Sequence, residues 1–152
     1  MSFDPTDTRL LAALQKNALL TSQQLGEILN LSPSQAARRR QRLEARGYIR
    51  RCRAVLDPAR IGLSVQAFIQ VQMARHSPEA ARDFTALAQS VPEITDVWIL
   101  TGEADYMLRV HCRDLSALNH LIQQVLQPHP DVARVQSQIV MEHLKQDEPL
   151  PL

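Results

Sequence analysis

Hydrophobic side chains in the first thirty residues recur at the three- and four-residue spacing of amphipathic helices. Asp4 followed by Pro5 predicts a helix to about Gln15, because aspartate caps a first turn and proline suits the first helical position. Thr21 with Gln24 three residues later is a capping-box pattern, which predicts a short second helix. The hydrophobic positions that place these two helices are Leu10, Leu11, Leu14, Leu25, Ile28 and Leu29.

A third helix is predicted directly after a tight turn. Ser32 is a good cap, Pro33 suits the first helical position, and Gln35 completes a second capping-box pattern. The helix should run to about Arg46 and stop at Gly47, because glycine enters a left-handed cap without a steric penalty. Two short helices joined by a tight turn, with a third helix before them, predict a helix-turn-helix domain.

The third helix has one hydrophobic side and one polar side. On a helical wheel, Ala36 and Leu43 share one side and are predicted to face the core. The opposite arc carries residue types that read bases in DNA grooves, since arginine binds guanine, glutamine binds adenine and serine binds either a base or a phosphate. Arg39 flanks the core side and is expected to contact phosphate. The base-reading arc consists of Ser34, Gln35, Arg38, Gln41 and Arg42.

Positive charge is concentrated in the same part of the chain. The stretch from Leu31 to Arg53 holds eight arginines and a single acid, Glu44. Up to residue 60 there are 11 basic and 5 acidic residues, whereas the remainder has 6 basic and 11 acidic residues. Arg50 and Arg51, in an extended segment after the third helix, are expected to form a wing that contacts the DNA backbone. A solvated helix face is the alternative for such a charge run, but the scarcity of compensating acids favours polyanion binding.

From residue 65 onward the hydrophobic period changes from helical to alternating. Alternation predicts strands over 65–73, 94–101, 106–112 and 132–140. Helices are predicted after Ser77-Pro78, ending near residue 91, and after Asp114, ending before Pro128. This β-α-β-β-α-β order is typical of a ferredoxin-like domain. The chain is therefore predicted to be α+β, with a helix-turn-helix domain at 1–52, a linker at 53–63 and a ferredoxin-like domain at 64–152.

Both helices of a ferredoxin-like domain cover one face of its sheet, so the other face is bare in a monomer. That face would carry Phe68 and Trp98 among glutamines. Because a monomer has little reason to expose such residues, the sheet face is expected to pair with a second copy. A dimer would also set two third helices for successive major grooves of a pseudo-palindromic operator.

Several classes of function lack support in the sequence. Cys52 and Cys112 lie far apart, no secretory signal opens the chain, and no apolar run is long enough to span a bilayer, so a cytoplasmic protein without membrane contact is expected. The five histidines form no metal-binding pairs, and no nucleophile set or glycine-rich phosphate loop occurs. We expect neither an enzyme nor a protein with a metal or other cofactor.

Taken together, the two halves carry several connected motifs of one known family. These are LSPSQAARRRQRLEARGYI, RAVLDPARIGL, QVQMARHSPEA, ILTGEADYMLRV and the closing Leu150-Pro151-Leu152. In motif order and spacing the chain resembles the Lrp/AsnC family of feast/famine transcriptional regulators. The resemblance implies an N-terminal DNA-binding domain and a C-terminal domain for dimerisation and effector binding. It also implies homodimers that join into tetramers, octamers or larger assemblies, and effectors that are usually amino acids.

The resemblance also implies where an effector binds. The family's effectors sit near the turn between the second and third strands, which here places Thr101, Gly102, Glu103 and Asp105 at the site. Gly102 would bring backbone amides near a ligand carboxylate, and Asp105 would pair with an α-ammonium. Read from the residues alone, the same stretch is an ordinary hairpin turn.

The chain departs from the family at two positions. Ala104 stands where many relatives have an aromatic residue, which removes a possible contact to the ligand or to a neighbouring dimer. Arg40 stands where relatives commonly have an aliphatic residue, so its charge must reach solvent, a phosphate or an acid such as Asp4 or Asp7. The competing function is a small-molecule sensor whose helical domain contacts proteins instead of DNA.

Overall fold

A computed structural model describes residues 4–146 and 148–152. The chain forms two compact units: a helical unit made of the residues up to Val55 together with Leu144–Leu152, and a sheet unit made of Leu56–His143. Within the described residues, no helix is both long and apolar enough to cross a membrane. The domain boundaries expected from the sequence stay a prediction.

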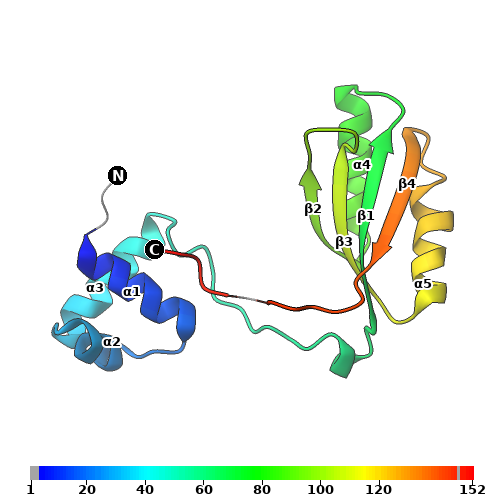
Figure 1. The fold of residues 1–152 in the computed structure, drawn as a ribbon. Coiled ribbons are helices and arrows are strands. Elements are labelled where there is room, and N and C mark those ends of the chain that lie inside the picture. The colour runs from blue at the N-terminus through cyan, green and yellow to red at the C-terminus, as the bar shows by residue number, and fades with distance from the viewer. Residues whose placement is uncertain (1–3, 147) are drawn as a thin grey trace. The chain divides into compact units, whose positions relative to one another are not determined.

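The helical unit contains α1 (Pro5–Lys16), α2 (Ser22–Leu29) and α3 (Pro33–Ala45) (Figure 1). Each helix begins where its sequence signal predicted. The Asp4 carboxylate accepts the Thr6 amide at 2.8 Å, and complete capping boxes open α2 at Thr21 and α3 at Ser32. Gly47, just beyond α3, has a φ of 76°, which is the left-handed conformation that glycine adopts without strain. The predicted three-helix arrangement is therefore confirmed.

The core of the helical unit is small, and one side chain expected in it lies outside. Its buried members are Leu10, Leu14, Leu25, Leu29, Ala36 and Leu43. Ile28, which we predicted to share the hydrophobic face of α2, is 42% exposed, so this prediction was wrong. The buried arc of α2 runs instead from Leu25 through Leu29 to Gly26, and Ile28 lies just outside the Leu25 edge of this arc.

Gly26 belongs to the buried arc of α2 because the turn that leads into α3 packs against it. A Cβ atom at this position would lie 2.6 Å from the carbonyl oxygen of Leu31, in the turn that leads into α3. Only a residue without a side chain lets the turn pack so closely on α2. The tight connection between the second and third helices therefore depends on this glycine.

Leu150, near the end of the sequence, is hydrogen-bonded to α1. The side-chain amide of Gln15 makes two hydrogen bonds to the backbone of Leu150: its Oε1 accepts the Leu150 N–H at 2.6 Å, and its Nε2 donates to the Leu150 carbonyl at 3.2 Å. The helical unit is therefore built from two separate stretches of sequence.

The connection between the units has little regular structure. Residues 50–57 form neither helix nor strand, so the extended segment expected to act as a wing pairs with no other strand among the described residues. A 3₁₀ turn, η1 (Ala59–Ile61), follows this segment. The Asp57 carboxylate accepts a hydrogen bond from the Ala59 amide at 3.0 Å at the start of this turn. Gly62 then ends the turn with a φ of 85°.

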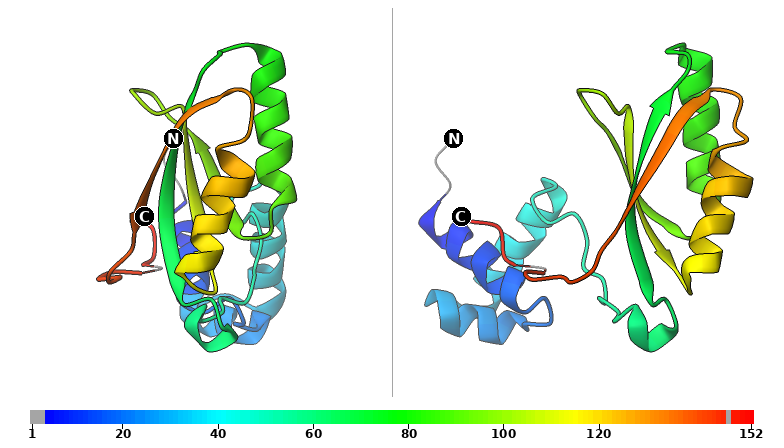
Figure 2. Two further views of the ribbon diagram at one scale, coloured as in Figure 1. Left: turned by 90° about the vertical axis from the view of Figure 1, so that its right-hand side faces the viewer. Right: turned by 45° about the vertical axis from the view of Figure 1, so that its right-hand side comes forward.

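The sheet unit has the predicted β-α-β-β-α-β order. It contains β1 (Val65–Met73), α4 (Pro78–Ser90), β2 (Ile94–Ile99), β3 (Tyr106–Cys112), α5 (Leu115–His120) with its continuation η2 (Leu121–Leu126), and β4 (Val132–Ile139). The strand order is β2-β3-β1-β4, with every neighbouring pair antiparallel. Both long helical segments cover the same face of the sheet (Figure 2). The ferredoxin-like prediction is confirmed, although β2 stops two residues before the predicted Thr101.

The helix predicted after Asp114 changes its winding halfway along. Its first part is α-helical, whereas Leu121–Leu126 is a π-helix. Leu121 and Leu126 are both buried, at 4% and 0% exposure. Residues five apart diverge on an α-helix, but the wider π turn with its i→i+5 hydrogen bonds keeps them on one side. The π winding thus lets both leucines reach the sheet.

The face of the sheet opposite the helices is open, as predicted. Alternate residues of β1 (Ala67, Ile69 and Val71) are fully buried, and the residues between them point to the open face. Trp98 is 42% exposed there, and Phe68 is partly exposed. We call this surface the open sheet face; across the four strands it carries Gln66, Phe68, Gln70, Gln72, Trp98, Met107, Arg109, His111, Arg134, Gln136 and Gln138.

Candidate functional site

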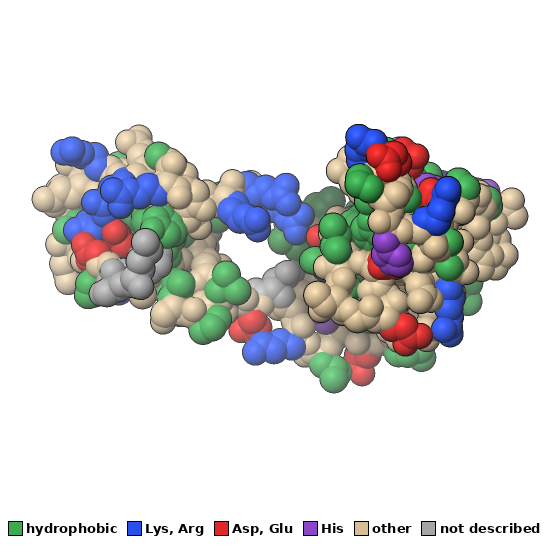
Figure 3. Space-filling model, turned by 90° about the horizontal axis from the view of Figure 1, so that it is seen from above, with side chains coloured by type: hydrophobic (Ala, Val, Ile, Leu, Met, Phe, Trp, Pro, Cys, Tyr) green, Lys and Arg blue, Asp and Glu red, His purple; other side chains and the backbone are tan. Residues whose placement is uncertain are grey.

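The core side of α3 holds the helix in place and leaves its arginines on the surface. Ala36 and Leu43 are 0% and 2% exposed, as the helical wheel predicted. Figure 3 shows Lys and Arg side chains on the helical unit, some of them beside acidic side chains. The arginines of α3 therefore do not all face solvent in the same way.

Two arginines of α3 form ion pairs with the start of α1. Arg39 Nη1 lies 2.8 Å from Asp4 Oδ2 and 2.7 Å from Asp7 Oδ1, and Arg42 Nη2 lies 2.7 Å from Asp7 Oδ2. Asp7 is only 7% exposed. The hydrogen bond from Arg39 lowers the pKa of Asp4 to about 2, so this carboxylate stays ionised in any ordinary buffer.

Arg40 also pairs with an acid, but on the other flank of α3. Its Nε lies 2.9 Å from Glu44 Oε1, one turn along the same helix, and its Nη1 donates to the Leu20 carbonyl at 3.3 Å. Of the acids considered from the sequence, Asp4 and Asp7 are taken by other arginines, so those two candidates were wrong. Glu44 stands four residues after Arg40, which is the spacing at which side chains meet on a helix.

Two of the predicted base readers take part in the helix cap. Gln35 Oε1 accepts the Ser32 amide at 3.0 Å, and Ser34 Oγ lies 3.1 Å from Ser32 Oγ. By contrast, Arg38 is exposed and has no hydrogen-bond or ion-pair partner in the described part of the chain, and the same holds for Arg50 and Arg51. These three arginines are the freest cations of the predicted DNA-binding set.

The turn between β2 and β3 is closed by a backbone hydrogen bond. The Leu100 amide donates to the Asp105 carbonyl at 2.9 Å, and Gly102 has a φ of 120°, which L side chains rarely adopt. The Asp105 carboxylate accepts the Met73 amide at 2.7 Å and lies 2.8 Å from His76 Nε2. The Met73 amide and, after it, His76 lower the pKa of Asp105. Asp105 thus anchors the turn to the end of β1.

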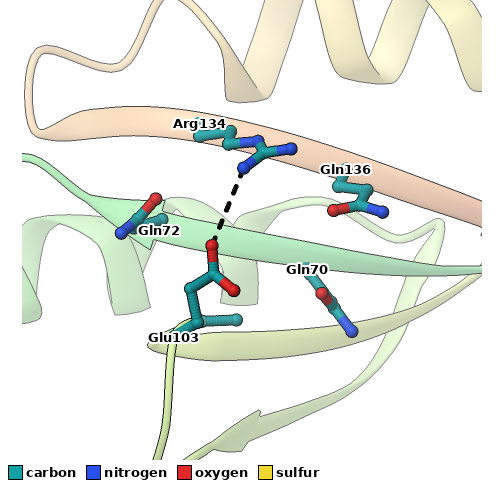
Figure 4. A pocket seen from close by; sticks show the side chains of 6 residues that line it. Gln70, Gln72, Glu103, Arg134 and Gln136 are labelled. Atoms are coloured by element: carbon teal, nitrogen blue, oxygen red, sulfur yellow. Dashed lines mark ion pairs between the residues drawn. The ribbon is translucent and has the colours of Figure 1, made fainter.

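A shallow hollow opens beside this turn on the open sheet face. Figure 4 shows Glu103 from the turn and Arg134 from β4 pointing toward each other, with glutamines on either side. Glu103 Oε1 and Arg134 Nη1 are 3.8 Å apart, and both side chains are exposed. We call this the turn hollow; its lining consists of Gln70, Gln72, Glu103, Ala104, Arg134 and Gln136.

The turn does not bring all four predicted effector residues to one place. Glu103 lines the turn hollow, whereas Asp105 lines a second hollow together with His76, next to the start of α4. Thr101 and Gly102 line neither of these two hollows. Sequence reasoning missed Arg134 and Gln136, although alternation along β4 and its place beside β1 in a ferredoxin-like sheet could have put them near the turn.

Both halves of the chain match models of known protein families. A family model described as the Lrp/AsnC ligand binding domain matches residues 66–150, and one described as winged helix-turn-helix DNA-binding matches residues 3–50. The chain belongs to the Lrp/AsnC family. It is therefore a transcriptional regulator with a DNA-binding helix-turn-helix domain and a ligand-binding domain, as the resemblance implied.

Relatives align over almost the whole chain. The DNA-binding transcriptional activator DecR of Escherichia coli K12 is 33% identical, with 98% of each chain covered. The HTH-type transcriptional regulator AldR of Mycolicibacterium smegmatis is 34% identical over 97% of this chain and 86% of its own. Among solved structures, a Neisseria meningitidis transcriptional regulator in complex with L-Met is 37% identical with a TM-score of 0.93, covering 99% of this chain and 97% of its own. An AsnC family regulator from Agrobacterium tumefaciens is 30% identical with a TM-score of 0.89, covering 98% and 97%.

Proposed function

We propose that this regulator binds operator DNA through α3 and the segment that follows it, and that an amino acid changes this binding. The DNA-binding proposal rests on the exposed side chains of α3 that lie opposite its buried Ala36 and Leu43. Arg38 lies at the centre of this exposed side and has no partner among the described residues. Membership of a family of transcriptional regulators also supports two further parts of the proposal. The protein acts in the cytoplasm, associated with the bacterial nucleoid, and it is not an enzyme.

The proposed contacts divide into two kinds. Ser34, Gln35, Arg38 and Arg42 read base edges in the major groove, because α3 presents them on its outer side. Arg39, Arg50 and Arg51 contact the phosphate backbone, and these contacts position the protein without reading sequence. The N–H groups of Gln35 Nε2 remain available, since its capping bond uses only Oε1.

Fluorescence anisotropy with a random-sequence duplex, measured over a series of salt concentrations, tests DNA binding. We expect the affinity to fall steeply as salt rises, since each neutralised phosphate contributes a log–log slope of about −0.9. Weak binding that is insensitive to salt would refute the proposal and favour a sensor whose helical unit contacts proteins.

Two substitutions then separate the two kinds of contact. Arg38→Ala should cost about 1–3 kcal/mol on a duplex selected for tight binding, and much less on random DNA. Arg50→Ala should weaken binding to both duplexes equally, because a phosphate contact carries no sequence information. Equal losses from both variants on both duplexes would contradict this division.

We propose that the turn hollow holds the effector amino acid. It offers a carboxylate, Glu103, for an α-ammonium and a guanidinium, Arg134, for an α-carboxylate, and the two charges stand at the spacing of a loose, exposed ion pair that a ligand can separate. The glutamines beside them supply further donors and acceptors. Because the hollow is open, a second copy of the chain is expected to complete its wall.

L-Methionine is the first amino acid to test, because the relative from Neisseria meningitidis was solved with it. A thermal-shift screen of the twenty amino acids should raise the Tm for the true effector, since a ligand that binds only the native state stabilises it. Arg134→Gln and Glu103→Gln should abolish this shift. A shift that survives both changes and is lost with Asp105→Asn would move the site to the second hollow.

We also propose that the open sheet face pairs with a second copy in a homodimer, which can assemble further into tetramers, octamers or larger particles. Trp98 and Phe68 on this face favour burial, and a symmetric dimer fits a two-fold operator. Light scattering should give a dimer or larger particle. Trp98→Glu, which puts a charge into the proposed interface, should shift the particle toward the monomer, and an unchanged mass would refute this interface.

A further inference from the structure

Among the described acids of the helical unit, Asp7 stands apart because it is buried and binds two arginines of α3 at once. One of its oxygens accepts Arg39 Nη1 at 2.7 Å and the other accepts Arg42 Nη2 at 2.7 Å. Its side chain is 10% exposed, whereas the side chains of the two arginines are 27% and 44% exposed. A single carboxylate on α1 thus fixes two cations on the neighbouring helix.

We infer that Asp7 is a positioning residue that determines DNA sequence specificity by aiming Arg42 and by weakening the phosphate contacts that Arg39 and Arg42 make. This inference rests on the proposed DNA binding through α3. It adds a residue on a different helix, which touches no DNA itself.

Because Asp7 is buried, its ion pairs with Arg39 and Arg42 persist when DNA binds. Exposed ion pairs are weak and phosphates displace them easily. A carboxylate with little access to water behaves differently, because removing its partners leaves an uncompensated charge in a poorly solvated place. Asp7 is in this second situation, since nearly all its surface is covered. Phosphate groups therefore compete poorly for the bonds that Arg39 and Arg42 make to it.

The geometry leaves Arg42 half free in a defined orientation. Asp7 holds only its Nη2, so Nε and Nη1 have no partner among the described residues and the side chain is 44% exposed. A guanidinium has five N–H donors in a rigid plane, so anchoring one nitrogen fixes the direction of the rest. An arginine held in this way can present a fork to a guanine edge while losing little freedom on binding.

Arg39 is more completely occupied. Its Nη1 is shared between Asp4 and Asp7, at 2.8 Å and 2.7 Å, and its side chain is 27% exposed. These two carboxylates neutralise it before DNA is bound. Arg39 therefore contributes less to phosphate binding than a free arginine such as Arg38, and Asp7 lowers the affinity for DNA of any sequence.

Asp7→Asn tests the inference, with Glu27→Gln as a control that removes one negative charge from the same unit without freeing an arginine. The probes are a random-sequence duplex and the tightest duplex selected by the wild-type protein. Asp7→Asn should steepen the log–log salt slope on the random duplex by about 1 to 2, as one or two arginines reach phosphates. It should also lower the ratio of selected to random affinity at least about fivefold, while Glu27→Gln changes neither.

A second variant keeps the test decisive if Asp7→Asn does not fold, which circular dichroism reveals. Arg42→Lys retains the charge beside Asp7 but lacks the planar fork, so it should lower the affinity ratio by a similar factor and leave the salt slope nearly unchanged. A folded Asp7→Asn protein with the wild-type ratio, or Arg42→Lys with the wild-type ratio, would overturn the inference. Wild-type protein without salt-dependent DNA binding would instead refute the proposed function itself.

Discussion

Leu43→Ala should unfold the helical unit while leaving the sheet unit folded. Leu43 is 2% exposed and is one of six buried core residues in the described part of this unit. Removing most of a buried leucine side chain typically costs about 2–5 kcal/mol, because the cavity closes only in part. A unit of about 64 residues has a total stability of only about 3–10 kcal/mol. The substitution therefore removes a large share, up to all, of the unit's stability.

Urea denaturation with two probes measures this effect. The chain has a single tryptophan, Trp98, which lies on β2, so tryptophan fluorescence follows the sheet unit. Circular dichroism at 222 nm follows helices of both units, and a helical unit that unfolds early appears as a separate loss at low urea. Binding to random duplex DNA should disappear together with that first transition.

Leu19→Ala is the matched control, since Leu19 belongs to the same unit and is 88% exposed. It should change the free energy of unfolding by no more than about 0.5 kcal/mol. The reasoning fails if Leu43→Ala behaves like Leu19→Ala. It also fails if the fluorescence transition moves as far as the early helical transition, because the two units would then unfold as one.

Three further changes probe other features. Gly26→Ala should destabilise the helical unit by about 1–3 kcal/mol in the same urea assay, because the new Cβ would lie 2.6 Å from a backbone oxygen; wild-type stability would contradict that close approach. Cys52 is exposed, whereas burial raises the pKa of the Cys112 thiol, so a thiol reagent should label Cys52 quickly and Cys112 only after unfolding, as peptide mass spectrometry can check. In the folded protein the pKa of Asp105 is lowered from 3.8, chiefly by the Met73 amide. The ionised carboxylate therefore contributes its full stabilisation above pH 3.8, and this contribution is lost as the pH falls through the pKa of the folded state. Asp105→Asn should flatten the acid-induced loss of stability in urea titrations at a series of pH values.

The helices and strands could be predicted because their signals are local. The caps at Asp4, Thr21 and Ser32 involve residues two or three positions apart, and each opens its helix in the structure. Alternation along β1 likewise depends only on its own residues. Ile28 failed because its spacing fits the hydrophobic face of α2, whereas its burial depends on where α1 and α3 lie.

The functional surface depends more on contacts between distant residues. Arg39 and Arg42 meet Asp7 across 32 and 35 positions, and no spacing rule links residues so far apart. Arg134 meets Glu103 only because β4 lies beside β1, next to the turn. The sequence could thus indicate the stretch that we propose to read DNA and the turn that we propose to lie near an effector. It could not tell which charges on those stretches are already paired.

The clasp between Gln15 and Leu150 affects the order in which the protein can fold during synthesis. The two residues are 135 positions apart, although both belong to the helical unit. At about 5–20 residues per second, the ribosome needs roughly 7 to 27 seconds to make the chain between them. The three N-terminal helices leave the ribosome long before the sheet unit is complete, yet Leu150, the partner of the Gln15 amide, is made only after the whole sheet unit. The helical unit therefore begins to fold before the sheet unit but reaches its final form only after the sheet unit has been made.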